Sequence, residues 1–473
     1  MVVGQNHMLR HLTIEGTIMK TFLTTAAAIA LLTATSARAE DAAGDWAGVI
    51  AGQLDVVIHL TRGADGKLTG MLESVDQGDA RLPIDAVEAT SDHLHFLVPA
   101  AGGSYDGVWT EATREWTGTW TQGQPIALNL HRATAADAPP KRPQEDAIAN
   151  APLPYSAETV SFGALAGTFT KPQGPGPFPA VVLIAGSGPN NRDEDVFGHK
   201  VFLVLADYLT RQGIAVLRYD KRGIGASKGD FGTATTADFI TDAEAAAAYL
   251  KTRPDVDTKH IGLIGHSEGG LVAPAVAAND PGVSFVVLMA GTGLRGDAVL
   301  KSQGELIARA NGASEADIAK GGAMRDMAFA VIESAADAAD ARAKLTAGAA
   351  RAVAAGQLKQ EDADRNIAQL TSPWMFAFLR YDPVPALTKV RVPVLAIDGS
   401  LDLQVEPKAN LAAIKLALKN DQDVTITELP GLNHLFQTAK TGSPNEYNGI
   451  EETISPVALK TIGDWVVAHS GKK

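Results

Sequence analysis

The segment 265–269 of this chain, Gly-His-Ser-Glu-Gly, carries the clearest chemical pattern. It fits G-x-S-x-G, in which a serine stands on a strained turn between a strand and a helix. An apolar run at 261–264 precedes the segment and small apolar residues at 270–278 follow it, as this arrangement requires. Glycine is expected at both ends because a Cβ would clash in so crowded a turn. The pattern and its context therefore predict that Ser267 is a nucleophile.

A serine hydroxyl attacks a carbonyl efficiently only when a base takes its proton and a carboxylate orients that base. His434 follows the last strand-like run of the chain, and Asp402 follows the apolar run 394–397. The separations are 402 − 267 = 135 residues and 434 − 402 = 32 residues. Asp398 ends the same apolar run, so spacing alone leaves it as an alternative to Asp402.

The elements that must position these residues alternate along the chain. Short apolar strands separated by helical stretches from residue 155 onward predict a mainly parallel sheet with helices on both faces. The interval between Met289 and Val394 is far longer than a normal crossover. Its Ala-, Asp-, Lys- and Glu-rich sequence predicts a helical cap at 295–372, above the carboxyl ends of the strands, where such folds bind ligands. The alternative is a helical excursion without a role in the site.

A different pattern precedes this region. Short strand-like runs with Gly-rich turns predict a small antiparallel sandwich or barrel at 40–135. Four of the six tryptophans lie there, at positions 46, 109, 116 and 120. Such residues can form a carbohydrate- or lipid-binding face, but more often they fill the core of a small β-domain, which we favour. The proline-rich segment 136–154 is predicted to be a linker to a catalytic domain at 155–473.

The first 39 residues differ from the rest in composition. A lysine, an apolar run and then Ala-Arg-Ala at 37–39 are typical of a secretory signal peptide with cleavage before Glu40. Residues 1–18 are interpreted as an upstream extension. The apolar run is too short for a stable transmembrane helix, so a retained membrane anchor is the weaker interpretation. We therefore expect a secreted or periplasmic protein without stable insertion in a membrane.

Net charge and cysteine content argue against several classes of protein. The formal net charge is −13, and without residues 1–39 the chain has 38 basic (41 − 3) and 53 acidic (54 − 1) residues. This balance argues against nucleic acid and anionic lipid as partners. With no cysteine, the chain has no disulfide, thiolate metal site or cysteine nucleophile. The acidic residues at 190–195 lack the spacing of a calcium loop and are interpreted as loop-fixing pairs, so no metal site is predicted.

Around the predicted nucleophile, acid and base, the sequence resembles the α/β-hydrolase superfamily. The segment 220–227 is similar to that family's D-x-R-G-x-G-x-S segment, and 399–402 is similar to its G-x-x-D motif. The resemblance covers residues 155–473, and it is particularly to exported bacterial serine carboxylesterases with an extra N-terminal β-domain and a G-S-G-P loop. It implies a mostly parallel eight-stranded sheet and the chain order Ser, Asp, His. It thus implies that Asp402 is the triad acid and Asp398 its structural neighbour.

The same resemblance indicates where an oxyanion would be stabilised. Acyl transfer needs preorganised donors, typically two backbone N–H groups. One is expected from Glu268, which follows the nucleophile. The other is expected from the loop 185–189, which resembles the family's H-G-x loop with alanine in place of histidine, and Ser187 N–H is preferred to Gly186 N–H. The loop lacks the Lys-Ser/Thr pair and the glycine spacing of phosphate-binding turns.

Together these patterns predict a secreted serine hydrolase that cleaves small-molecule carboxylic esters through an acyl-enzyme, with no cofactor and no metal. Trp374 and Phe376 precede the acid strand and are candidate substrate contacts, although packing of the cap on the body is an equal interpretation. An aminopeptidase-like serine peptidase on the same fold is the alternative. A binding protein with a secondary hydrolase domain is less favoured, because no triad member is lost. The patterns do not indicate the acyl group, the alcohol group or the oligomeric state.

Overall fold

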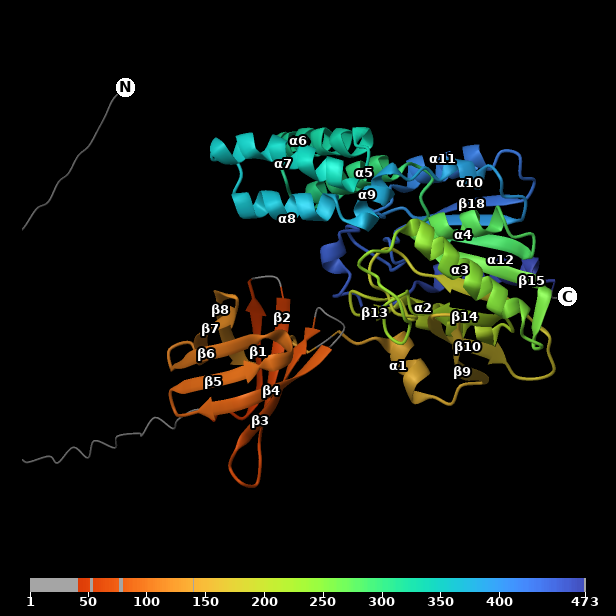
Figure 1. Ribbon diagram of the computed structural model, residues 1–473. Helices are drawn as coiled ribbons and strands as arrows, with labels where there is room; N and C mark the ends of the chain where they lie inside the picture. The colour runs from red at the N-terminus through yellow and green to blue at the C-terminus, as the bar shows by residue number, and fades with distance from the viewer. Residues whose placement is uncertain (1–40, 52–53, 76–79, 139, 472–473) are drawn as a thin grey trace, which may run out of the picture.

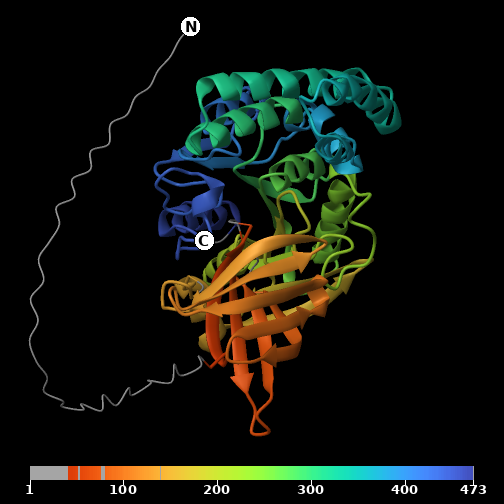
Figure 2. The same ribbon diagram turned by 90° about the vertical axis from the view of Figure 1, so that its left-hand side faces the viewer.

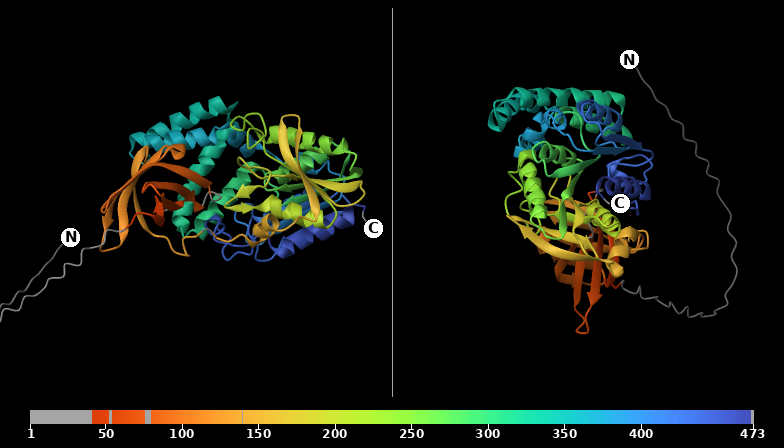
Figure 3. Two further views of the ribbon diagram at one scale, coloured as in Figure 1. Left: turned by 90° about the horizontal axis from the view of Figure 1, so that it is seen from below. Right: turned by 90° about the vertical axis from the view of Figure 1, so that its right-hand side faces the viewer.

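The computed structural model describes residues 41–51, 54–75, 80–138 and 140–471. They form a closed β-barrel, an α/β domain and a layer of helices on the α/β domain (Figure 1). The barrel and the α/β domain lie side by side, as the view from below also shows (Figure 3). The signal peptide predicted at 1–39 and the cleavage site before Glu40 lie outside the described residues.

The N-terminal barrel consists of eight antiparallel strands and closes because β1 pairs with both β2 and β8. An eight-stranded barrel has an interior just wide enough for side chains to fill. Here Trp46, Trp116 and Trp120 are buried, and the first two meet edge to face with ring centroids 5.9 Å apart. The tryptophans therefore fill the core of the barrel. The strands are β1 (Gly44–Ile50), β2 (Leu54–Arg62), β3 (Leu68–Ser74), β4 (Ala80–Ala89), β5 (His93–Val98), β6 (Gly103–Thr110), β7 (Glu115–Gln122) and β8 (Gln124–Arg132), with the short helix η2 (Pro99–Ala101) before β6.

The α/β domain is built on an eight-stranded sheet in the order β18-β17-β16-β15-β11-β14-β10-β9. The strands from β18 to β14 in this order run parallel, and the β9–β10 hairpin adds two antiparallel strands at one edge. Strands β11 and β16 are apolar along nearly their whole length, as expected where helices cover both faces. The predicted fold class is confirmed. The strands are β9 (Tyr155–Phe162), β10 (Leu165–Pro172), β11 (Phe178–Ile184), β14 (Ala215–Tyr219), β15 (Val256–His266), β16 (Val283–Met289), β17 (Val394–Gly399) and β18 (Val424–Leu429), and β12 (Asp195–Val196) with β13 (His199–Lys200) forms a separate small pair.

Two apolar cores lie on the two faces of this sheet. One contains buried residues of α3, α4, α10 and α11, and the other contains buried residues of α1, α2 and α12. Within the described part of the chain, no helix has both the length and the apolar character needed to span a membrane. The helices are α1 (Pro143–Asn150), α2 (Val201–Arg211), α3 (Thr236–Lys251), α4 (Gly269–Ala277), α10 (Val384–Leu387), α11 (Pro407–Ala417), α12 (Pro456–His469) and η3 (Pro444–Glu446).

Five of the helices between β16 and β17 form a layer over residues 296–380, so the cap predicted at 295–372 extends one helix further. They lie above the α/β domain, and the longer ones extend toward the side of the barrel (Figures 1 and 2). Ile332, Ala341 and Leu379 form a small core of their own within this layer. The helices are α5 (Gly296–Ala310), α6 (Glu315–Ser334), α7 (Ala338–Ala354), α8 (Gln360–Leu370) and α9 (Pro373–Arg380).

The segment 136–154 contains a helix that the linker prediction does not include. Helix α1 starts with Pro143 in its first turn, where a missing N–H is tolerated, and it buries Ile148 in the core around α2. Arg142 precedes it and donates to the carbonyl oxygens of Gly198 at 2.7 Å and Asn448 at 2.8 Å. Proline here therefore starts a helix that packs on the α/β domain, in a segment for which the sequence predicts only a linker.

The barrel core makes a first prediction. Trp46→Ala should lower the free energy of unfolding of the barrel by about 3–5 kcal/mol, because it leaves a large cavity among the remaining tryptophans. Guanidinium unfolding followed by tryptophan fluorescence measures this, since four of the six tryptophans lie in the barrel. Val108→Ala is the control, because Val108 is 53% exposed and its truncation should change stability by less than about 0.5 kcal/mol. Equal losses in the two variants would contradict the prediction.

Candidate active site

Ser267 stands on a strained turn at the end of β15. Its φ is +52°, a left-handed conformation that is uncommon for a residue other than glycine. The serine N–H donates to Met289 O on the neighbouring strand at 2.9 Å, and α4 begins two residues later. Strain of this kind persists only where the surrounding structure holds it, and it is concentrated at functional sites.

The two glycines of the motif are required by close backbone contacts. A Cβ on Gly265 would lie 2.0 Å from Gly269 O, and a Cβ on Gly269 would lie 2.0 Å from Ile184 O. Both neighbours are backbone atoms that cannot move aside. The crowding expected from the sequence pattern is therefore present on both sides of Ser267.

The candidate base and acid meet directly. His434 Nδ1–H donates to Asp402 Oδ2 at 2.6 Å, and both side chains are buried. The other carboxylate oxygen, Oδ1, accepts from the backbone N–H groups of Gln404 at 2.7 Å and Val405 at 2.8 Å. The carboxylate is thus fixed by three donors, and it fixes His434 in the tautomer whose Nε2 can accept a proton.

Asp398 occupies a different position from Asp402. It is fully buried at the end of β17, where its Oδ1 accepts from Gly399 N–H at 2.8 Å. Burial and the nearby Asp402 carboxylate raise the pKa of Asp398 well above its usual range. The structure therefore brings Asp402 to His434 and leaves Asp398 as a buried neighbour whose surroundings favour the protonated carboxyl.

Two residues with unused backbone donors line the space at Ser267. Ser187 and Glu268 line one small cavity together with Ser267. Among the described residues, neither the Ser187 N–H nor the Glu268 N–H has an acceptor. Gly186 is different, because its N–H donates to Glu194 Oε1 at 2.6 Å. The alternative assignment of Gly186 as oxyanion donor is therefore corrected, because its N–H is already used to hold the loop.

The side chain of Glu268 joins three parts of the site. Its Oε1 accepts from Thr236 Oγ1 and from Trp374 Nε1, both at 2.7 Å. Its Oε2 lies 3.3 Å from Lys221 Nζ, and the same Nζ donates to Gly186 O at 2.6 Å. All of these contacts are buried or partly buried. One buried ion pair thus connects the turn after Ser267, the loop before Ser187 and the cap helix α9.

A second buried pair connects the loop to the base. Glu194 Oε1 accepts from His266 Nδ1–H at 3.0 Å, and His266 Nε2–H donates to His434 O at 3.0 Å. Burial by itself lowers the pKa of His266, but the Glu194 charge and these hydrogen bonds outweigh it, and the net shift is upward. Both ring nitrogens therefore act as donors. Through the side chain of His266, the residue before Ser267, this arrangement links Glu194 in the loop after β11 to the backbone of His434.

The other charges at 190–195 also pair within the fold. Arg192 binds the buried Asp220 through two nitrogens, at 3.0 Å and 2.6 Å, and Asp193 pairs with Arg218. The described residues contain no group of three or more histidine, aspartate or glutamate side chains placed to hold a metal ion. Arg192 and Asp193 thus hold the loop in place through ion pairs with residues elsewhere in the fold. Sequence reasoning missed His266 and Lys221 as positioning residues and did not identify the partner of Glu194, because the partners of these residues are up to 168 residues away in the chain.

The cap closes the space above Ser267. The small cavity there has a volume of about 50 Å³, and Trp374 lies in its wall. Phe376 does not line it, and the side chain instead packs in the cap core with Arg380 over its ring at 5.0 Å. Phe378, and not Phe376, lines the cavity beside Trp374. The two residues are one helical turn apart, and their rings stack with centroids 5.0 Å apart. The remaining lining residues are Thr292, Val299, Leu300, Gln303, Gln404 and Val405.

The sheet, the strained serine turn and the His434–Asp402 pair define an α/β-hydrolase. Residues 199–438, just over half of the chain, match the family model described as "Serine aminopeptidase, S33". The chain belongs to this family.

Two curated proteins are similar in sequence. Esterase EstD from Thermotoga maritima is 29% identical over 298 residues, which is 63% of this chain and 64% of EstD. The match therefore spans just under two thirds of that relative. Thiohydrolase apmlB from Arthrinium phaeospermum is 39% identical over 79 residues, 16% of this chain and 25% of that protein.

Solved structures are similar at lower identity. The structure of the DcsB complex with its substrate analogue has a TM-score of 0.43 and 18% identity, and covers 67% of this chain and all of that chain. The Pyrococcus furiosus esterase Pf2001 has a TM-score of 0.42 and 14% identity, and covers 67% of this chain and 93% of its own.

The buried Lys221–Glu268 pair makes a second prediction. Lys221→Met should lower the free energy of unfolding by about 3–5 kcal/mol, because it leaves the Glu268 carboxylate buried without a counter-charge. Adding Glu268→Gln should recover most of this loss, because the amide keeps an acceptor for Trp374 and Thr236 without the charge. Urea unfolding of the wild type, both single variants and the double variant gives the coupling. A double variant no more stable than Lys221→Met would contradict the ion-pair explanation.

Asp398 makes a third prediction, about pH. A carboxyl whose pKa is raised in the folded state stabilises the fold below its unfolded pKa, and this contribution is lost as pH rises toward the folded pKa. The Asp398→Asn variant has no carboxyl to titrate at this position. Its free energy of unfolding, relative to that of the wild type, should therefore increase with pH by up to ~1.4 kcal/mol per pH unit above about pH 4. Urea unfolding at several pH values measures the difference. Parallel stability curves for the two proteins would contradict the raised pKa.

Proposed function

We propose that this protein is a secreted serine carboxylesterase acting on small-molecule esters. The observation that carries the proposal is the cavity that Ser267 shares with Ser187 and Glu268, whose N–H groups have no acceptor among the described residues, together with the buried His434–Asp402 pair. A nucleophile, an oriented base and oxyanion donors are the parts that acyl transfer needs. Family membership and the similarity to an esterase support the same class of reaction.

The reaction follows from these positions. Ser267 Oγ attacks the ester carbonyl carbon while His434 Nε2 takes the hydroxyl proton, and the carbonyl electron pair moves to oxygen. The N–H groups of Ser187 and Glu268 stabilise that oxyanion. The oxyanion collapses, the alcohol oxygen leaves with the proton from His434, and Ser267 remains acylated. Water then repeats the same steps with His434 as base, which releases the carboxylic acid and restores Ser267.

Export is the second part of the proposal. The residues at 19–39 have the order of a signal peptide, and the chain has no cysteine that an oxidising compartment would affect. N-terminal sequencing of the protein purified from its natural source tests this part. A chain beginning at Glu40 supports export, and a chain retaining Met19 in the cytoplasm contradicts it.

The name of the family model favours a second candidate, an aminopeptidase. An aminopeptidase must receive the substrate's α-ammonium group, which calls for a carboxylate in the substrate cavity. Glu268 is the one acid among the residues that line the Ser267 cavity, and its side chain already binds Lys221, Trp374 and Thr236. The site therefore favours a neutral acyl group. Turnover of an ester and an anilide with the same acyl group compares the two candidates, and a faster anilide would overturn the esterase proposal.

The two aspartates give the sharpest test of the mechanism. Asp402→Asn should lower kcat for an aryl ester roughly 10⁴-fold, because the asparagine amide favours the wrong histidine tautomer. Asp398→Asn is the matched control, since it replaces a neutral carboxyl with a neutral amide, and it should cost less than about tenfold. Ser267→Ala should abolish both hydrolysis and labelling by a fluorophosphonate. Retained labelling in Ser267→Ala, or equal losses in the two aspartate variants, would contradict these roles.

A further inference from the structure

The space at Ser267 is too small for a whole substrate. Its volume of about 50 Å³ compares with roughly 300–1,000 Å³ for ordinary small-molecule sites. It holds little more than the reacting carbonyl and its first neighbours. The rest of any larger ester must therefore lie in another space that this cavity adjoins.

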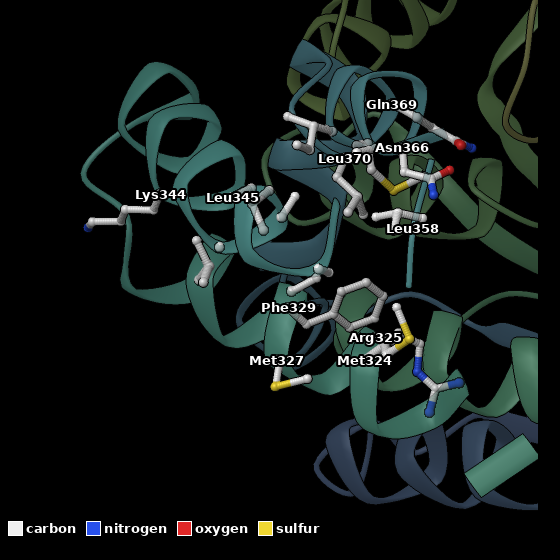
Figure 4. A pocket seen from close by; sticks show the side chains of 18 of the residues that line it. Met324, Arg325, Met327, Phe329, Lys344, Leu345, Leu358, Asn366, Gln369 and Leu370 are labelled. Atoms are coloured by element: carbon white, nitrogen blue, oxygen red, sulfur yellow. The ribbon is translucent and has the colours of Figure 1, made fainter. Parts of the chain in front are cut away.

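A second cavity of suitable size lies between the cap helices and opens to solvent where Met324 and Met327, two of its lining residues, are 51% and 65% exposed. It has a volume of about 530 Å³ and is formed between α6, α7 and α8. Phe329, Leu345, Leu358 and Leu370 surround one space from these helices and the turn before α8, as Figure 4 shows. Most of the lining is apolar, including three methionines, whose flexible side chains adapt to ligands of different shape.

The two cavities share one wall. Leu300 of α5 lines both the cavity at Ser267 and the cavity in the cap. On α9, Trp374 lines the first cavity and the next residue, Met375, lines the second. The cavity beside α10 and α11 and the cavity between the barrel and residues 445–449 share no lining residue with the Ser267 cavity. Movement of the Leu300 side chain would therefore open a path from the nucleophile into the cap.

The charges at the cap cavity are already neutralised. Arg325 Nη2 donates to Glu305 Oε1 at 2.8 Å, and Lys344 Nζ donates to Asp340 Oδ2 at 2.7 Å. Lys344 also points away from the ring of apolar side chains (Figure 4). The cavity therefore offers no unpaired cation to an anionic ligand. Its chemistry suits a neutral hydrocarbon chain, for which burial is worth about 0.8 kcal/mol per methylene.

We propose that the cap cavity binds the acyl chain of a medium- to long-chain ester, with Leu300 at the passage from Ser267. This inference rests on the proposed esterase function. We assign the acyl chain, and not the alcohol, to the cap cavity for one reason. His434 must reach the oxygen of the leaving alcohol, and His434 does not line the cavity at Ser267. The alcohol therefore lies on the side of His434, and the acyl chain lies in the Ser267 cavity and continues toward the cap.

Gly348 of α7 provides a variant that fills the cavity without harming the fold. Gly348 lines the cavity, and an added Cβ there would meet nothing within 4 Å. Gly348→Phe also replaces a poor helix former within a helix. Gly321 of α6 is the matched control, because it is exposed and has open space at its Cβ like Gly348, but it does not line the cavity. The experiment compares acetyl, octanoyl and dodecanoyl nitrophenyl esters on wild type, Gly348→Phe and Gly321→Phe.

Wild type should prefer the octanoyl and dodecanoyl esters to the acetyl ester in kcat/KM. Gly348→Phe should lower kcat/KM for the two long esters roughly tenfold or more, which corresponds to losing the contacts of about two methylenes. The acetyl ester should change by less than about twofold in the same variant, and Gly321→Phe should leave all three esters unchanged. Equal effects of Gly348→Phe on all chain lengths would overturn the cavity assignment and leave the esterase proposal standing.

Binding without turnover separates the two proposals. Calorimetric titration with 2-dodecanone, a neutral ketone that cannot be hydrolysed, should show binding to wild type and Gly321→Phe, and at least tenfold weaker binding to Gly348→Phe. If no ester is hydrolysed but this pattern holds, the esterase proposal fails and the hydrocarbon site stands. If the ketone binds all three proteins equally, or binds none of them, the hydrocarbon site is refuted whatever the esters show.

Discussion

The buried contact between Lys221 and Glu268 is the interaction on which the candidate site depends. Lys221 donates to Gly186 O at the start of the oxyanion loop and meets the Glu268 carboxylate on the turn after Ser267. Each charge would be costly to bury alone, and together they are tolerated because hydrogen bonds satisfy both. The two backbone N–H groups that would stabilise an oxyanion therefore belong to segments that one ammonium group holds together. Preorganised donors of this kind are effective because they need no rearrangement during the reaction.

The same carboxylate also connects the chemistry to the cap. Trp374 Nε1 donates to Glu268 Oε1, so α9 is held directly on the residue whose N–H is a proposed oxyanion donor. Moving α9 away would leave one buried acceptor contact unmade, at a cost of about 1–3 kcal/mol. A closed cap and an ordered oxyanion site thus stabilise each other. A lid that only excluded water would not need the contact between Trp374 and Glu268. In this protein the cap therefore also helps to position Glu268.

The parts of the site that are local in sequence were predictable, and the parts that depend on distant partners were not. Each triad candidate, Ser267, Asp402 and His434, follows a parallel strand. The carboxyl ends of parallel strands lie at the same end of a sheet, so this position alone predicts that the three residues lie near one another. Lys221 follows a strand too, but nothing near it in sequence indicates a partner 47 residues away. The sequence indicates Trp374 and Phe376 as substrate contacts, but it does not indicate which face of α9 meets the Ser267 cavity, because that face is set by packing on the α/β domain. In the barrel, the short strand runs were recognisable, whereas β4 carries polar and proline residues that hide its alternation.

The cavity in the cap has a cause in the sequence of its helices. Protein interiors normally pack without large voids, so space for a ligand must be left by small side chains. Helix α7 supplies these, because Gly348, Ala349 and Ala352 all line the cavity. The faces of the sheet, by contrast, are filled by leucine, valine, isoleucine and phenylalanine from both cores. The proposed catalytic groups therefore lie in the densely packed part of the chain, and the proposed acyl-chain cavity lies in the loosely packed part. On this proposal, substitutions in α6 to α8 should change chain-length preference without disturbing the groups around Ser267.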